Sequence, residues 1–442
     1  MHIRLSDHFT CGRLFRFVLP SILMMVFMSV YGVVDGFFIS NYGGKVPFAA
    51  VNVVMPFVMV LGAFGFMLGS GGSALVAKIL GQGRKEAANR AFSMLVSFTF
   101  ALGSLITAVA LLVLRPVCER LGATPEMMPW CLGYGRILIV FNTAFMLQCV
   151  FQSLLITAER PALGLYVMLG AGCANMALDA LFVGVFSWGV RGAAWATIIS
   201  QLIGFGVPLA YFLAPNSSPL RIRAAWWSFR ILARACANGA AALFGNIATH
   251  IVSMAFNYQL MRWLGAGGVA AYGVMMYVSF VFVAILIGYS AGISPVISFA
   301  YGAKNRAELH NLHRKSLLLM AAGGMLMAVL AELLAEPMAS FYVSYDTELL
   351  ALTIHGFRLF SLAFVLSGLN IYASNLFTAL NNGAVAATIS FLRTLVFELL
   401  AVFLLPLVFG INGIWGAVAA AELAAFGIAS LFLVRLAPRY GY

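Results

Sequence analysis

Residues 175–197 read NMALDALFVGVFSWGVRGAAWAT. This stretch places an amide and a carboxylate, Asn175 and Asp179, four residues apart in an otherwise apolar run. On a helix, that spacing puts both side chains on one face. An ionised carboxylate at the centre of a bilayer costs about 2.5–3.5 kcal/mol on insertion scales, so an acid there is normally kept for a transport pathway or for coupling. A second acid in an apolar run, Asp35, favours that role over an acid at the membrane surface or one paired with a neighbouring helix.

The composition excludes an ordinary soluble protein. The 442 residues are 63% hydrophobic and 9% charged, whereas soluble globular chains are about 45–50% apolar and 25% charged. The formal net charge is +12, but the basic residues lie in short loops between apolar runs, so nucleic acid is not an expected partner. The six cysteines show no paired metal or redox spacing. The composition therefore predicts a polytopic membrane protein in contact with lipid.

The hydrophobic residues fall into twelve long runs, and each is long enough to cross a bilayer of about 30 Å as a helix. The sequence thus predicts an all-α membrane protein. An even number of crossings puts both termini on one side. Because 18 of the 26 basic residues lie on that side, both termini are expected in the cytoplasm and the chain in the plasma (inner) membrane. The predicted segments are 14–39, 49–77, 91–114, 131–157, 162–187, 191–213, 235–262, 269–299, 315–335, 352–380, 383–408 and 411–434.

The chain divides at residues 214–234, which we interpret as a cytoplasmic linker because they hold two prolines and four arginines. The predicted domains are an N-terminal six-helix lobe, residues 1–213, and a C-terminal six-helix lobe, residues 235–442. With a constant offset of 221 residues, identical residues recur in the two halves. Two repeats of six crossings must lie parallel, and folds of this kind bind substrate between the halves. The matched pairs include Ala49 with Ala270, Gly71 with Gly292, Gly81 with Gly302, Thr157 with Thr378, Gly189 with Gly410, Gly192 with Gly413 and Phe205 with Phe426.

The repeat is broken at the acids. Asp35 corresponds to Phe256 and Asp179 to Leu400, so the acidic pair belongs to the N-terminal half alone. The C-terminal half carries polar stripes instead, and hydrogen bonding between helices explains them as well as lining of a cavity does. The candidate cavity-lining residues of the two halves are Tyr31, Gln148, Gln152, Asn246, His250, Ser253, Asn257, Ser374 and Asn375.

Two further acids, Glu398 and Glu422, lie in apolar segments of the C-terminal half. Glu398 follows Arg393 by five residues, which is a poor spacing for pairing along one α-helical face. We interpret both acids as structural or as lying at a cavity edge. Pro20 lies inside the first segment, where it removes one backbone hydrogen bond and favours a kink. A helix that bends there and carries Asp35 could link ion binding to a change of shape.

Taken together, these features resemble the multidrug and toxic compound extrusion (MATE) family of transporters. The resemblance covers essentially the whole chain and includes the opening LPSILMMVFMSVYGVVDGFFI, the loop GQGRKEAANRAF with its echo YGAKNRAE, and the stretch that begins at Asn175. It implies two V-shaped lobes that open alternately to the two sides of the membrane. It also implies a cation-coupling site at Asp35, Asn175, Asp179 and Thr197, and a bending proline at Pro20.

The resemblance implies export of cationic or amphipathic small molecules in exchange for H⁺ or Na⁺. Asn175 and Thr197 supply neutral oxygens that would suit Na⁺ and would equally support a protonated aspartate, so both ions stay open. Some relatives use acids in segments seven and ten, but here segment seven has none and segment ten offers Asn375. We expect no other metal or cofactor and a monomeric chain.

Three other functions are weighed against this one. A flippase of the same superfamily for lipid-linked saccharides would have a basic cavity for phosphates, whereas the mid-membrane charges here are mostly acidic. A major-facilitator carrier usually has an Asp in its basic loop, where this chain has Gln82 and Gly83. A membrane enzyme is not expected, because no HExxH, Gly-x-Ser-x-Gly or metal-ligand spacing lies in the apolar segments.

Overall fold

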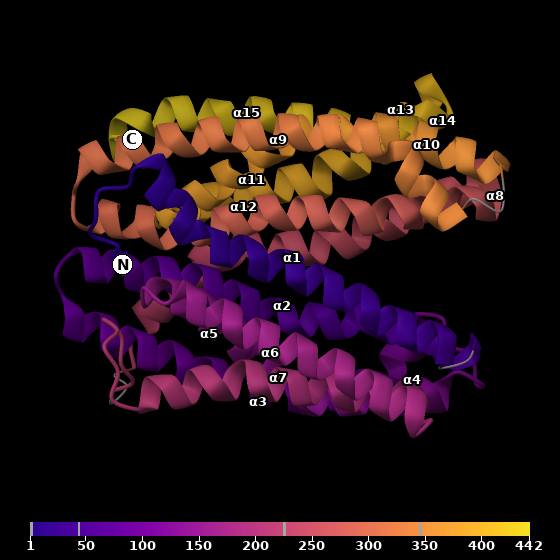
Figure 1. The fold of residues 1–442 in the computed structure, drawn as a ribbon, viewed down its shortest axis with the longest axis horizontal. Coiled ribbons are helices and arrows are strands. Elements are labelled where there is room, and N and C mark those ends of the chain that lie inside the picture. Colours follow the sequence, from indigo (N-terminus) through magenta and orange to yellow (C-terminus); the bar gives the residue numbers. More distant parts are fainter. Residues whose placement is uncertain (1–2, 43–44, 224–226, 344–346) are drawn as a thin grey trace.

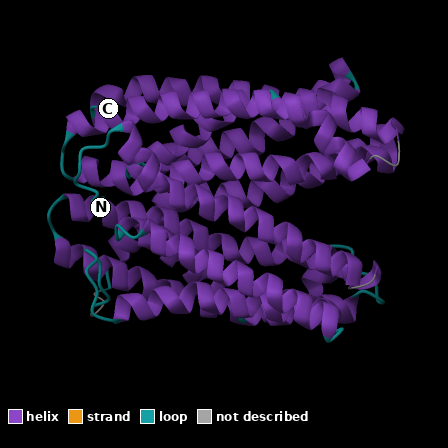
Figure 2. Ribbon diagram, viewed as in Figure 1, coloured by secondary structure: helices purple, strands orange, loops and turns teal. Residues whose placement is uncertain are grey.

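The computed structural model describes residues 3–42, 45–223, 227–343 and 347–442. The described part is made of helices and loops and contains no β-strand (Figure 2). Helices dominate because hydrocarbon offers no water, so each backbone N–H and C=O must be satisfied within its own segment. The helices are α1 (Cys11–Tyr42), α2 (Lys45–Gly81), α3 (Lys85–Arg120), α4 (Met128–Val140), α5 (Asn142–Thr157), α6 (Pro161–Asp179), α7 (Gly189–Leu213), α8 (Phe229–Gly302), α9 (Arg306–Val343), α10 (Thr347–Ser361), α11 (Phe364–Ala379), α12 (Gly383–Phe391), α13 (Glu398–Phe409), α14 (Ile411–Trp415) and α15 (Ala417–Tyr440), with π-helical turns η1 (Ala180–Val185) and η2 (Leu392–Phe397).

Within the described residues, ten helices are long and apolar enough to cross a membrane. Two bent pairs, α4 with α5 and α10 with α11, add up to two more crossings, with bends of 47° and 45°. The long run α8 holds two crossings, because Gly265 turns the chain with φ 64° and ψ −153°. The all-α membrane fold with up to twelve crossings confirms the fold predicted from the hydrophobic runs.

The helices form two bundles that lie side by side (Figure 1). The elements α1 to α7 make one bundle and α8 to α15 the other, and the two chain termini lie at the same end of the molecule. The backbone repeats with the offset seen in the sequence, since left-handed conformations occur at Gly83 and Lys304 and again at Gly189 and Gly410. The bends between α4 and α5 and between α10 and α11 also fall at matching places.

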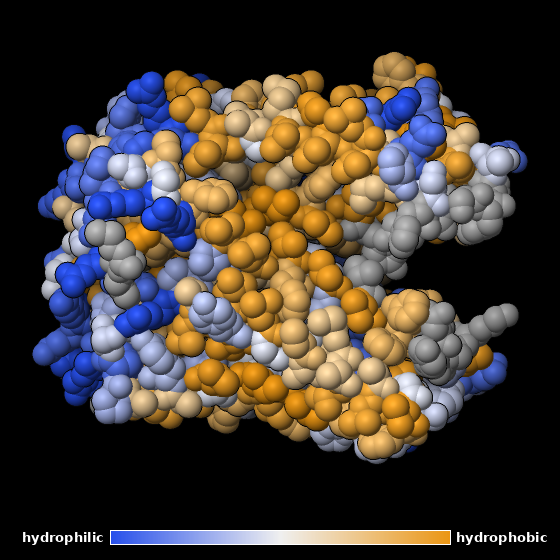
Figure 3. Space-filling model, in the orientation of Figure 1, coloured by the Kyte–Doolittle hydropathy of each residue, from blue (hydrophilic) through white to orange (hydrophobic). Residues whose placement is uncertain are grey.

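Glycines bring the two bundles into backbone contact. A methyl group at Gly71 of α2 would lie 2.0 Å from the carbonyl oxygen of Ala235 in α8, and one at Gly302 would lie 2.1 Å from the carbonyl oxygen of Lys78. Only glycine permits such close approach of two helices. The opposite end of the molecule is hollowed between the bundles (Figure 3). The bundles are therefore closed against each other at the end that carries the termini.

The N-terminal segment before α1 contacts both bundles at this closed end. The backbone N–H of Leu5 donates to the carboxylate of Glu159 at 2.8 Å, and that of Phe9 donates to Glu308 at 3.0 Å. The ring nitrogen Nδ1 of His8 lies 2.6 Å from the same Glu308 carboxylate. The side chains of Leu5 and Phe9 are buried. The segment thus ties the loop after α5 to the start of α9.

We predict that Gly71→Ala lowers the thermal unfolding temperature of the purified protein. Alanine is better than glycine in a helix by about 1 kcal/mol, but overpacking against an immovable backbone costs about 1–3 kcal/mol. Gly170→Ala is the matched control, because a methyl group there meets nothing within 4 Å. Its unfolding temperature should stay level or rise. Equal unfolding temperatures for the two variants would contradict the close contact between α2 and α8.

Candidate functional site

Asp179 is a fully buried acid at the end of α6, and its side chain has 0% exposure. Neither carboxyl oxygen has a hydrogen-bond partner among the described residues. The next residue begins the π-helical turn η1. Such turns are rare and often mark functional sites, because they change which side chains share a helix face. The acid therefore lies where the helix departs from regular geometry.

Asp35 lies on α1, which packs against α6, and it is half-buried. The carboxyl groups of Asp35 and Asp179 interact directly with each other. One oxygen of Asp35 is also buried without a hydrogen-bond partner among the described residues. The structure therefore brings together the two acids that lie 144 residues apart in the sequence.

Two tyrosines lie beside this acidic pair. Tyr134 of α4 is 1% exposed and interacts electrostatically with both Asp35 and Asp179. Its hydroxyl group contacts the sulfur of Met55 at 3.7 Å. Tyr31, one turn before Asp35 on α1, also interacts with that acid. Aromatic rings and a thioether thus surround the pair and keep water away from it.

Asn175 precedes Asp179 by four residues on α6 and is 1% exposed. Neither the oxygen nor the nitrogen of its amide has a partner among the described residues. Thr197 lies half-buried on α7, which packs against both α6 and η1. Its backbone carbonyl accepts a hydrogen bond from Ser200 at 2.7 Å, but no described hydrogen bond joins Thr197 to the acidic pair.

The chemistry of the site follows from these unmet groups. A buried polar group without a hydrogen bond costs about 1–3 kcal/mol, and a charged one costs more. A proton or a cation bound between the acids would remove that cost, and the oxygens of Asp35, Asn175 and Asp179 suit a hard cation. Among the described residues, no group of three or more His, Cys, Asp or Glu side chains is placed to hold a metal ion. The site is thus built from one pair of acids and neutral groups.

Helix α1 runs as one helix through Pro20, from Cys11 to Tyr42. Proline has no backbone N–H, so the carbonyl of Arg16 lacks its usual helical partner. Pro20 itself is half-buried. The predicted bend at this residue stays a prediction.

The candidate cavity-lining residues have different surroundings. Gln148 is 5% exposed and packs against Gly204 of α7, so it lies inside its own bundle. Gln152 donates to the sulfur of Met168 at 3.7 Å. In the second bundle, Asn257 is exposed, whereas His250 and Ser253 are half-buried. Three of the predicted residues bond to backbone carbonyls: Asn246 to Ala242, Ser374 to Ala386 and Asn375 to Ile371.

The second bundle contains a buried ion pair that joins two crossings. The guanidinium group of Arg393 donates to the carboxylate of Glu422 at 2.6, 3.0 and 3.1 Å. Ser367 donates to the same carboxylate at 2.9 Å and Asn370 donates at 2.6 Å. The side chains of Arg393 and Glu422 are 16% and 2% exposed. Glu422 is therefore a structural acid, as its position in the sequence suggested.

The turn η2 carries Arg393 and ends directly before Glu398. In a π-helix the hydrogen bonds run from i to i+5, so residues five apart lie above one another. Arg393 and Glu398 accordingly interact. The spacing that looked unsuitable on an α-helix is thus suitable on this turn, and our expectation for the pair was wrong for that reason.

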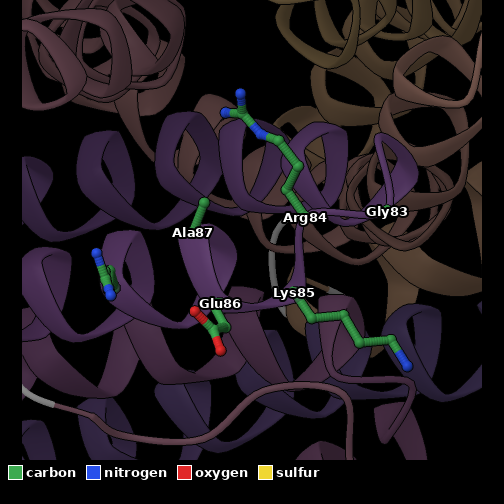
Figure 4. Close-up of a pocket in the computed structure, with 6 residues that line it drawn as sticks. Gly83, Arg84, Lys85, Glu86 and Ala87 are labelled. Atoms are coloured by element: carbon green, nitrogen blue, oxygen red, sulfur yellow. The ribbon is translucent and has the colours of Figure 1, made fainter.

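A recess of 490 Å³ lies at the start of α3, at the end of the molecule that carries the termini. Figure 4 shows that the side chains of Arg84 and Lys85 point away from each other. The recess holds neither Asp35 nor Asp179 and belongs to the basic loop. Its lining residues are Gly83, Arg84, Lys85, Glu86, Ala87 and Arg90.

Comparison with known families adds to this geometry. The family model MatE matches residues 20–181 and again residues 241–404. The two matches begin 221 residues apart, which is the offset of the internal repeat. The chain belongs to the MATE family. The resemblance read from the sequence is thereby confirmed, and the protein is a multi-span membrane protein of a multidrug efflux transporter family.

Individual relatives are distant but similar over their whole length. Multidrug export protein MepA of Staphylococcus saprophyticus is 19% identical to this MATE chain over 402 residues, which cover 91% of the chain and 87% of the relative. A crystal structure of MATE in complex with MaL6 has a TM-score of 0.92 at 20% identity, covering 98% and 97% of the two chains. An outward-facing MATE family multidrug resistance transporter of the MOP superfamily has a TM-score of 0.91, with the same identity and coverage. These structures share the fold.

The sequence did not point to Tyr134 or to the pairing of Arg393 with Glu422. One signal was available for the ion pair, because an arginine in an apolar segment requires a carboxylate partner. Four carboxylates were in apolar segments, however, and nothing in the sequence chose among them. The choice depends on how the crossings of the MATE fold are packed.

We predict that Glu422→Gln strongly destabilises the MATE chain. Breaking a buried pair leaves an uncompensated charge and costs about 3–5 kcal/mol, whereas replacing both partners by apolar residues is often neutral. The double variant Arg393→Met, Glu422→Leu should therefore recover most of the lost thermal stability.

Glu119→Gln is the control for this prediction, because its partner Arg115 and Glu119 itself are 71% and 54% exposed. An exposed pair of this kind contributes about 0.3–0.5 kcal/mol. Thermal unfolding of the purified variants in detergent measures all three effects. Equal losses for Glu422→Gln and Glu119→Gln would show that the ion pair is not structural.

Proposed function

We propose that the chain is a secondary active antiporter that exports cationic or amphipathic small molecules in exchange for H⁺ or Na⁺. The observation that supports this most is the buried pair Asp35 and Asp179, whose oxygens lack hydrogen-bond partners among the described residues. A relative that is similar over most of its length is named a multidrug export protein. We place the protein in the plasma membrane as a monomer with both termini in the cytoplasm.

In this mechanism the acidic pair responds to the coupling ion. Two neighbouring carboxylates in a dry pocket repel each other and attract any cation nearby. An H⁺ or Na⁺ that binds the pair neutralises it and so lowers the affinity of the same bundle for a cationic substrate. Asn175 donates or accepts as the pair changes its charge, because its amide offers both a donor and an acceptor. Helix α1, which carries Asp35, repacks around Pro20.

We further propose that residues 1–213 and 235–442 move as two lobes, with residues 214–234 as a cytoplasmic linker. The glycine contacts between α2 and α8 support this division, because they involve backbones of both bundles at one end only. With the termini in the cytoplasm, the hollowed end faces outward. Alternating access then requires these contacts and those of the N-terminal segment to open when the outer end closes.

We predict that Asp179→Asn abolishes ion-driven export while the protein stays folded. The amide has the shape of the carboxyl group but neither charge nor affinity for H⁺ or Na⁺ at this position. The measurement is efflux of ethidium from proteoliposomes under an imposed proton gradient and, separately, an imposed sodium gradient. Thermal unfolding of the variant should match that of the unmodified protein.

Glu126→Gln is the matched control, since Glu126 is exposed in the loop before α4 and should leave export unchanged. Export driven by one gradient identifies the coupling ion. Full export by Asp179→Asn would refute the role of the pair. If neither gradient moves ethidium through the unmodified protein, transbilayer movement of a labelled polyprenyl-linked saccharide is the next assay, and its success would replace the exporter by a flippase.

A further inference from the structure

We propose that Glu398 is a second proton-binding site, located in the C-terminal half, with Arg393 and Glu422 as its positioning residues. The inference deepens the proposed function and rests on it only for the use that transport makes of the proton. Its physical basis is the arrangement of charged groups around η2.

The π-turn is the first step of the argument. Because η2 spans residues Leu392–Phe397, it carries Arg393 and Glu398 onto one face of the crossing. A regular α-helix would separate residues five apart by roughly 140° around its axis. The turn thus places a carboxyl group next to a guanidinium group that is already in use by another acid.

Glu422 is fully occupied, which is the second step. A carboxylate has about four lone-pair sites, and Glu422 accepts bonds from Arg393, Ser367 and Asn370. The pair of Arg393 and Glu422 is therefore neutral and held in place from three crossings. This leaves no second full charge on Arg393 to balance an ionised Glu398.

Glu398 itself has no hydrogen bond with any described residue, although it is only partly exposed. The charged and titratable groups that interact with it are Arg393 on its own crossing, Glu422 on α15 and Tyr272 on α8. When all are ionised except the tyrosine, the cluster has a net charge of −1. One proton on Glu398 brings that charge to zero.

An unmet acceptor at the same cluster is the third step. The amide nitrogen of Asn370 donates to Glu422, and its amide oxygen has no partner among the described residues although the side chain is 0% exposed. A buried acceptor of this kind requires a donor. A carboxyl group acquires an O–H donor only when it is protonated. The cluster thus contains both a carboxyl group that can take up a proton and an acceptor that lacks one.

The ligand is a proton rather than a metal ion or an organic cation. Arg393 already fills the cationic position beside the two carboxyl groups, so a further cation would be repelled by it. A proton binds to the oxygen itself and needs no additional room. The N-terminal half offers a parallel, because Asp179 directly precedes η1 just as Glu398 directly follows η2. Each half then carries an acid at the edge of a π-turn.

The test is a pH-difference infrared titration of the full-length protein in lipid nanodiscs, without any substrate. The unmodified protein should show a carboxylic-acid carbonyl band that appears on acidification and vanishes on alkalinisation. Glu398→Gln should lose this band. The double variant Asp35→Asn, Asp179→Asn should keep it, and so should the exposed control Glu126→Gln.

A second variant guards against a failure to fold. Glu398→Asp retains a carboxyl group, so the band should persist at a shifted frequency if it belongs to this residue. A band that is unchanged in both Glu398 variants, or one that is present but never titrates, would overturn the proposal. A response to added NaCl at constant pH, lost in Glu398→Gln, would replace the proton by a metal ion.

This readout is independent of export. A titrating band at Glu398 together with absent ethidium export would leave the proton site standing and remove the exporter. Ion-driven export with no band at Glu398 would do the reverse. If both hold, Glu398→Gln should reduce the number of protons taken up per exported ethidium.

Discussion

The absence of water in the hydrocarbon core is the constraint on which this structure depends. It requires every backbone polar group to be paired within its helix, and it makes each buried side-chain charge expensive unless a partner is supplied. Most of the chain obeys both demands: the described residues form helices, and the arginine inside a crossing is paired with Glu422 and two neutral donors. Asp35 and Asp179 do not obey the second demand, and that exception is the reason to assign them to ion binding.

The two halves use one scaffold for different chemistry. They share the bends between short helices, the left-handed turns and the π-helical segment in the crossing that carries the key acid. In the first half the acid next to the π-turn faces another acid, so the site is short of positive charge. In the second half it faces an arginine that is already neutralised. Duplication preserved the backbone, while substitutions at a few positions changed the balance of charge.

The contact between the halves combines tight packing with limited extent. Gly71 and Gly302 allow backbones to touch at the closed end, where dispersion contacts are numerous and no long side chain must be reordered. The N-terminal segment adds charged hydrogen bonds to Glu159 and Glu308. An interface of this kind can be strong when closed and still separate, because it contains no interlocked large side chains.

The sequence by itself determined the all-α membrane fold, the positions of the crossings and the repeat, since hydrophobic runs and a constant offset of 221 residues are local or periodic features. It also singled out Asp35 and Asp179, because acids are conspicuous in apolar surroundings. Their role in coupling stays a prediction, whereas their proximity is a property of how α1 packs on α6. Only the tertiary structure decided that Arg393 pairs with Glu422, that Tyr134 lies beside the acids and that Glu398 shares a face with Arg393. Those relations depend on the packing of separate helices and on a π-turn that no residue pattern in the chain announces.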